Sequence, residues 1–164
     1  MKRIIFTLGL VFLFALSGQA QEISENAIGL RFGGGNGFGA EISYQRHLNG
    51  ANNRLEGDLG FRNNSDFNSF KITGLYQWVW NIEGNFNWYA GVGGGFGNVN
   101  DRRPVGRHHH DGAFLFIAGD IGVEYVFDIP LQVFLDFRPE INLVNYNVYN
   151  SFGPDLAIGI RYQF

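Results

Sequence analysis

The chain has 164 residues, a formal net charge of −3, no cysteine, 24 glycines and 17 phenylalanines. The acidic balance argues against nucleic acid as a partner, because nucleic-acid binding usually requires a strongly basic face. The absence of cysteine excludes disulfides, thiol chemistry and a lipid attached to cysteine. Abundant glycine and aromatic residues with few prolines favour an antiparallel β protein with tight turns.

The first twenty residues have the pattern of a secretory signal peptide. Lys2 and Arg3 precede an apolar run, Ile4 to Leu16, and small residues lead up to Ala20. The run is too short to span a bilayer. We therefore expect residues 1–20 to be cleaved and residues 21–164 to form a single barrel domain. We expect no separate soluble domain after it, and so no peptidoglycan anchor.

Eight segments after the signal alternate apolar and polar residues with a period of two, which indicates β-strands. In chain order they are Asn26–Gly33, Phe38–His47, Arg54–Arg62, Ser69–Asn81, Asn85–Gly97, Ala113–Phe127, Leu131–Leu143 and Asp155–Phe164. None of them contains the run of about 18 apolar residues that a helical span needs. A membrane protein of this sequence therefore has to be a closed barrel, because only helices and barrels satisfy every backbone group in lipid.

The last segment alternates strictly and ends on an aromatic residue. Its apolar face consists of Leu156, Ile158, Ile160, Tyr162 and Phe164. This pattern resembles the closing strand of the small bacterial outer-membrane barrels of the OmpA-transmembrane-domain and OmpX group. The resemblance implies an eight-stranded antiparallel up-and-down transmembrane β-barrel, integral to the outer membrane and monomeric. It also implies as partners the membrane lipids, lipopolysaccharide and, through Phe164, the insertion machinery.

Charged residues within the predicted strands fall on the less apolar face, with both signs interleaved. The acids are Glu41, Glu56, Asp58, Asp120, Glu124, Asp136, Glu140 and Asp155, and the bases are Arg31, Arg62, Lys71, Arg138 and Arg161. We expect them to form a paired network in a narrow lumen. Arg46 breaks the alternation and is expected beyond the apolar band. Pro139 lies on the apolar face, where its missing N–H predicts a bulge or a rim position.

Loop lengths and aromatic residues indicate an orientation. If the mature N-terminus starts in the periplasm, the two longest connections, Asn98–Gly112 and Val144–Gly153, face outside and the periplasmic turns are short. Aromatic residues then gather at the periplasmic rim as half of an interfacial girdle. They are Tyr44, Trp78, Trp80, Phe86, Trp88, Tyr125, Phe127, Tyr162 and Phe164.

Two glycine motifs have structural explanations. The segment Gly35–Ala40 matches the G-x-G-x-x-G/A dinucleotide fingerprint, but alternating residues follow it instead of a helix, so a hairpin turn is favoured. The stripe Gly91, Gly93, Gly95 and Gly97 leaves one face of a strand bare. Phe116, Phe134 and Arg138 are candidates to fill the space above it.

The loop between the fifth and sixth strands holds the metal candidates. His108, His109 and His110 are weak candidates because adjacent histidines in a loop lack a defined third and fourth ligand. We therefore expect no metal and no cofactor. Arg102, Arg103 and Arg107 in the same loop either contact lipopolysaccharide phosphates or keep the loop hydrated. The later loop, Val144–Phe152, also alternates and predicts a strand continuing past a bulge.

These features predict a structural or surface-binding role in the cell envelope, without catalysis. Alternation alone also fits an exported soluble barrel that binds a small ligand, as lipocalins and avidin do, with the two faces exchanged. A lipid A-modifying barrel enzyme is a further alternative. It needs a nucleophile beside a base, and Ser151 and the histidine loop form no such pair on a strand. A pore is disfavoured because eight-stranded lumens are filled by side chains.

Overall fold

The structure is a computed structural model that describes residues 24–33, 39–48, 52–63, 67–101, 112–143 and 152–164. These ranges contain β1 (Asn26–Gly33), β2 (Glu41–Leu48), β3 (Asn53–Asn63), β4 (Phe67–Glu83), β5 (Phe86–Asp101), β6 (Gly112–Val126), β7 (Leu131–Asn142) and β8 (Phe152–Gln163). The signal peptide, the histidine loop and Ser151 lie outside them. Across the described ranges, no helix has the length and apolar character needed to cross a membrane.

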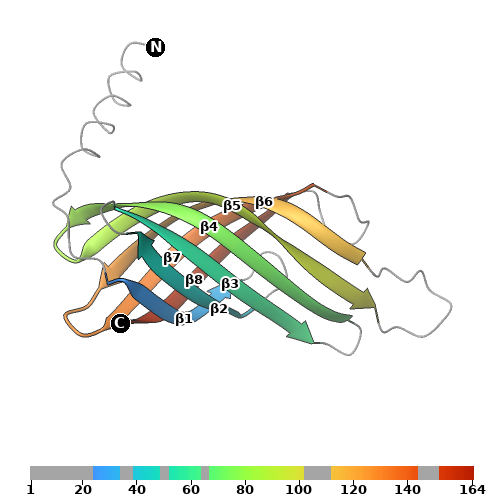
Figure 1. Ribbon diagram of the computed structural model, residues 1–164, viewed down its shortest axis with the longest axis horizontal. Coiled ribbons are helices and arrows are strands. Elements are labelled where there is room, and N and C mark those ends of the chain that lie inside the picture. The colour runs from blue at the N-terminus through green and yellow to red at the C-terminus, as the bar shows by residue number, and fades with distance from the viewer. Residues whose placement is uncertain (1–23, 34–38, 49–51, 64–66, 102–111, 144–151) are drawn as a thin grey trace, which may run out of the picture.

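The eight strands form one closed antiparallel barrel in which each strand pairs with the next and β1 pairs with β8 (Figure 1). Closure is reinforced beyond β8, where Asn26 donates its N–H to the carbonyl of Phe164 at 3.1 Å and Phe164 donates to Asn26 at 2.9 Å. Closure leaves no sheet edge along the β1–β8 seam. The predicted fold class, an eight-stranded up-and-down barrel, is confirmed.

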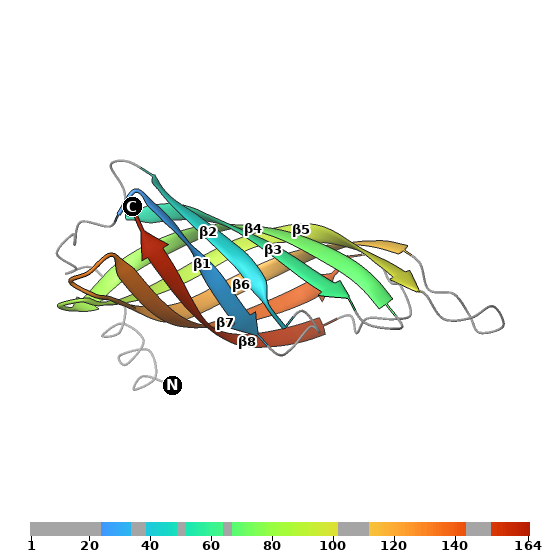
Figure 2. The same ribbon diagram turned by 90° about the horizontal axis from the view of Figure 1, so that it is seen from below.

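One end of the barrel, which we call the short-turn end, holds the start of β1, Phe164 and two tight turns (Figures 1 and 2). β4 and β5 are joined through Gly84 and Asn85, where Gly84 has a φ of 52° that favours glycine. Asn81 supports this turn by donating its side-chain amide to the carbonyl of Gly84 at 2.8 Å. β6 and β7 are joined through Phe127–Pro130.

Strand lengths differ from the prediction mainly at the opposite end, which we call the far end. β4 begins at Phe67 and β5 runs to Asp101, whereas alternation predicted Ser69 and Gly97 as these bounds. The two extensions pair with each other, from Phe67 opposite Asp101 inwards. Four of the six added residues are polar, namely Asn68, Asn98, Asn100 and Asp101, so the apolar and polar alternation that marks the rest of the strands is weak there.

Pro139 causes no bulge, so that part of the prediction is wrong. The β7–β8 register runs unshifted past the pair Pro139–Pro154, and the β6–β7 register is the same on both sides of the interruption. Because proline has no N–H to donate, the β6–β7 ladder breaks between Ala118–Glu140 and Ile121–Phe137. Pro139 lies three residues from the end of β7, which fits the rim alternative.

The barrel is inside out relative to a water-soluble protein. Side chains facing the lumen are largely polar or charged and buried, for example Arg31 and Arg161, both 0% exposed. Side chains on the outer wall are apolar and exposed, for example Leu156 at 62% and Ile158 at 61%. The alternation that defines the strands therefore places apolar residues outside and charges inside.

Aromatic rings in the lumen occupy places that glycines leave open on the neighbouring strand. Phe116 lies against Gly95, where an added Cβ would be 2.6 Å from the ring, and Phe114 lies against Gly97. Phe116 is one of the predicted fillers of the β5 glycine stripe, whereas Phe114 was missed. Phe134 packs against Gly159 of β8 instead of the stripe, so its predicted location is wrong.

Candidate functional site

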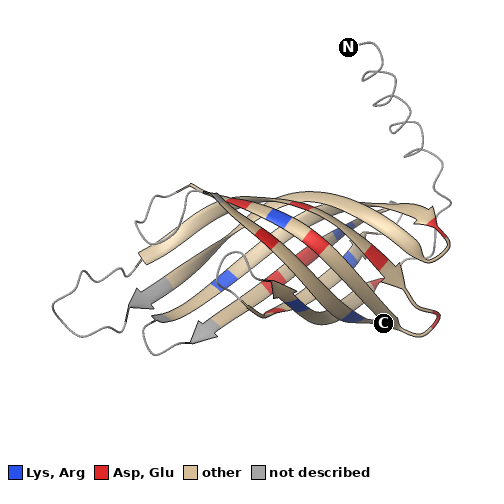
Figure 3. Ribbon diagram, turned by 180° about the vertical axis from the view of Figure 1, so that it is seen from behind, with Lys and Arg blue, Asp and Glu red and all other residues tan. Residues whose placement is uncertain are grey.

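The charged lumen is the most distinctive site in the described part of the chain. Figure 3 shows acidic and basic positions along the middle of the strands. Among described side chains, eight buried carboxylates face five buried cations, so most of the cations serve more than one carboxylate. The cations are Arg31, Arg54, Lys71, Arg138 and Arg161. The predicted paired network is present.

Arg31 joins four strands from its position on β1. Its guanidinium binds Asp136 of β7 through two hydrogen bonds of 3.0 and 2.6 Å. The same group donates to Asp155 of β8 at 2.7 Å and to Glu41 of β2 at 3.1 Å. Two parallel hydrogen bonds to one carboxylate fix the orientation of the guanidinium and also neutralise its charge. Arg31 therefore links the β1–β8 seam to the strands on either side of it.

Arg138 reaches across the lumen. It starts on β7, and its Nη1 lies 2.8 Å from Asp58 while its Nη2 lies 3.0 Å from Glu56. Both carboxylates belong to β3, which is four strands from β7 in either direction around the barrel. A side chain bonded to the opposite wall occupies the cross-section at that level.

Glu56 receives the largest set of partners in the described lumen. Its Oε1 lies 3.0 Å from Nη2 of Arg138 and 2.9 Å from Nη2 of Arg161. Its Oε2 accepts hydrogen bonds from the side-chain amides of Gln45 at 2.6 Å and Gln77 at 2.9 Å. Both oxygens of this buried carboxylate are therefore satisfied, which is what makes its burial tolerable.

Two further cation clusters lie on either side of this centre. Towards the far end, Lys71 lies 2.9 Å from Glu41 and 3.0 Å from Glu140. Towards the short-turn end, Arg54 on β3 binds Glu124 on β6 at 2.8 and 3.0 Å, again across the lumen. The network thus extends along the barrel axis.

Arg161 combines an ion pair with an aromatic contact. Its guanidinium carbon lies 3.6 Å from the ring centroid of Phe134, and it donates two hydrogen bonds to the hydroxyl of Ser43. Because Phe134 fits against Gly159 of the same strand, the missing side chain at Gly159 is what lets the ring lie beneath the arginine.

Most of the charged residues predicted for the lumen lie there in the structure, together with one that was not predicted, Arg54. Arg54 was missed because it lies at the first residue of its predicted segment, although it shares its parity with Glu56 and Asp58. The side chain of Arg62 is not among those described. Arg46 is exposed, and it lies opposite Asn26 in the β1–β2 register at the short-turn end, as its break in the alternation indicated.

Aromatic residues gather at the short-turn end, as predicted. The rings of Trp80 and Trp88 stack at 4.4 Å between centroids. Tyr125 contacts two other rings, with centroids 4.6 Å from Phe86 and 4.8 Å from Phe127. Further ring contacts join Tyr76 to Trp78 and Tyr162 to Phe164.

The carboxylates of the described lumen lie against cations and not in a group of metal ligands. Within the described ranges, no group of three or more His, Asp or Glu side chains could hold a metal ion. His108, His109 and His110 lie outside those ranges, so the prediction about them stays a prediction. Ser43 is buried and engaged by Arg161, which leaves its hydroxyl out of reach of a lipid substrate.

Comparison with known proteins gives likeness of fold. No model of a protein family matches the sequence, and no characterised protein matches it by sequence. Neisserial surface protein A aligns with a TM-score of 0.60 and 14% identity, over 85% of this chain and 94% of that one. The N-terminal β-barrel domain of Pseudomonas aeruginosa OprF aligns at 0.61 and 12%, over 86% and 99%. Ail, the attachment invasion locus protein of Yersinia pestis, aligns at 0.58 and 14%, over 86% and 97%. The chain has the fold of the small eight-stranded bacterial outer-membrane β-barrels.

Proposed function

We propose that this protein is an integral barrel of the bacterial outer membrane with a structural or surface-binding role and no catalytic activity. The observation that carries the proposal is the inverted distribution of side chains. The outer wall exposes large apolar residues on every strand, and the lumen holds the charges. An apolar surface of this extent is stable in lipid but drives aggregation in water.

The same observation weighs against the soluble ligand-binding barrel. Lipocalin-like barrels need an apolar cavity for a ligand. Here the lumen centre is filled by Arg138 and its carboxylate partners, and the part towards the far end is filled by Leu75, Phe114, Phe116 and Ala118. A structural or surface-binding role is also consistent with the names of two structural neighbours, a surface protein and an attachment invasion locus protein.

Orientation in the membrane belongs to the same proposal. The ring clusters at the short-turn end form an interfacial girdle, and tight turns are typical of the periplasmic side. We therefore place Phe164 and the Gly84 turn in the periplasm and the far end at the cell surface.

A charge scan on the outer wall tests the proposal. Val92 is 56% exposed midway along β5, and Ile82 is 58% exposed beside the turn at Gly84. In lipid, Val92→Arg should cost about 2–4 kcal/mol, whereas Ile82→Arg should cost about 1 kcal/mol or less near the interface. Folding into vesicles, followed by heat-modifiable gel mobility in urea, measures both. Equal, near-zero costs and recovery of the wild-type protein in the soluble periplasmic fraction would overturn the proposal.

A further inference from the structure

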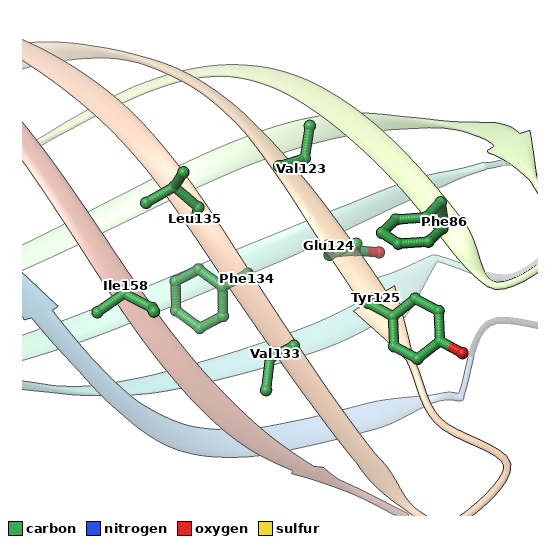
Figure 4. A pocket seen from close by; sticks show the side chains of 8 residues that line it. All are labelled: Phe86, Val123, Glu124, Tyr125, Val133, Phe134, Leu135 and Ile158. Carbon is green, nitrogen blue, oxygen red and sulfur yellow. The ribbon is translucent and has the colours of Figure 1, made fainter.

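A groove of about 200 Å³ lies on the outer wall over β5 to β8, close to the short-turn end (Figure 4). Six outward side chains line it, and the strands at Glu124 and Phe134 form its floor. The six are Phe86, Val123, Tyr125, Val133, Leu135 and Ile158.

The groove arises from a step in side-chain size. Tyr125 is the cross-strand partner of both Phe86 and Val133. The rings of Phe86 and Tyr125 lie 4.6 Å apart and form one wall, while the short, stiff valine side chain leaves space beside them. The lining is apolar and continuous with the rest of the outer wall, so it suits an apolar chain.

Charge at the adjacent turns indicates which head group suits this position. The two turns next to the groove, residues 81–85 and 127–131, contain two carboxylates and no Lys, Arg or His. Asp128 is exposed, and its Oδ1 accepts a hydrogen bond from Asn85 at 3.1 Å, which links the two turns. Glu83 is exposed on the other turn. A cationic head group is attracted here, and an anionic one is repelled.

We propose that the groove seats one acyl chain of an amine-headed phospholipid, with its ammonium group towards Asp128 and Glu83. This inference rests on the proposed membrane location. An ethanolamine head group fits because its ammonium group donates hydrogen bonds to carboxylates, whereas glycerol head groups present only negative charge and hydroxyls. The hydroxyl of Tyr125, at the same end of the groove, is able to donate to the lipid phosphate.

Lipid retention by the folded barrel tests the inference. The purified protein in detergent is mixed with phosphatidylethanolamine or phosphatidylglycerol carrying identical chains, and bound lipid is counted by native mass spectrometry. We expect one ethanolamine lipid to be retained about two- to fivefold more than the glycerol lipid, the size typical of exposed ion pairs. Equal retention of the two lipids, or a preference for the glycerol lipid, would overturn the head-group assignment.

Matched variants separate the chain from the head group. Val133→Phe fills the groove and should lower retention of both lipids, whereas Val92→Phe, on the outer wall away from the groove, should not. Val123→Phe fills the same groove from β6 if the first variant fails to fold. Asp128→Asn with Glu83→Gln should remove the preference but keep the chain bound. Unchanged retention in both groove variants, or a dimer that excludes lipid, contradicts the inference.

Two measurements on the same preparations distinguish a failure of this inference from a failure of the proposed membrane location. Heat-modifiable mobility and insertion into vesicles are measured on the same preparations. A barrel that inserts normally but retains no preferred lipid overturns this inference alone. A protein that never inserts overturns the proposed function as well.

Discussion

Arg138 on β7 and Glu56 on β3 form an ion pair of 3.0 Å between opposite walls of the barrel. Both side chains are buried, at 0% and 2% exposure. Neighbouring strands in this sheet are already joined by backbone hydrogen bonds, but β3 and β7 share none. The pair is therefore a tie across the lumen that the sheet itself does not provide.

Replacing Arg138 by methionine should destabilise the barrel by about 3–5 kcal/mol, because it leaves buried carboxylates without their cation. Urea titration of the folded fraction, followed by gel mobility, measures this. The double variant with Glu56→Gln should cost less than the sum of the single changes, since the two residues share one interaction. A single-variant loss within experimental error would show that the ion pair has no net effect.

Much of this barrel could be predicted from alternation alone, because each face of a strand meets a different environment. Ile158 and Arg161 have opposite parity on β8, and the structure places the first outside and the second in the lumen. The pairing of lumen carboxylates with lumen cations was also predictable, because acidic and basic residues share one face of the strands.

Individual partners were not predictable, because they depend on which strands lie opposite one another in the closed barrel. Arg54 finds Glu124 seventy residues away in the chain, and no local pattern encodes that distance. The placement of Phe134 against Gly159 likewise depends on register between β7 and β8. Alternation specifies the face of a residue, and register specifies its neighbour.

Gly159, which faces the lumen, should be far less tolerant of substitution than Gly57, which faces outward. At Gly159 an added Cβ would clash with the Phe134 ring and lie 2.6 Å from the carbonyl oxygen of Leu30, whereas at Gly57 it would meet nothing within 4 Å. We expect Gly159→Ala to cost about 1–3 kcal/mol by overpacking. Gly57→Ala should be neutral or stabilise by up to about 1 kcal/mol.

The same urea titration distinguishes the cause of that loss. Adding Phe134→Leu to Gly159→Ala should recover only part of the stability, because the Leu30 carbonyl still opposes the new methyl group. Complete recovery would place the whole clash at the ring. Equal effects of Gly159→Ala and Gly57→Ala would contradict the role assigned to lumen glycines.

The wild-type barrel should show no stepwise conductance in planar bilayers. Arg138 spans the lumen at one level, and the rings of Phe114 and Phe116 lie in the part of the lumen towards the far end. Replacing both Arg138 and Phe116 by alanine removes one obstruction from each level, and the folded fraction of that variant should show more frequent openings than wild type. Regular openings of the wild-type protein would contradict a filled lumen.

Phe164 should matter more for assembly in cells than its contacts explain. Phe164→Ala keeps the backbone bonds to Asn26 but loses the ring that stacks near Tyr162. Phe61→Ala is a matched control, because Phe61 is 62% exposed on the outer wall and Phe164 is 59% exposed. Removing similar rings from lipid contact should cost similar free energies of unfolding in vesicles.

If the terminal aromatic residue is also read by the insertion machinery, only Phe164→Ala should lower the amount of folded barrel in the outer-membrane fraction. Heat-modifiable mobility of that fraction gives the amount in cells, and refolding of the purified variants into vesicles gives the stability without the machinery. Equal losses in cells for the two variants would show that the ring contributes through lipid contact alone. A larger loss for Phe164→Ala in vesicles as well would assign its effect to closure of the β1–β8 seam, where the ring lies beside Tyr162.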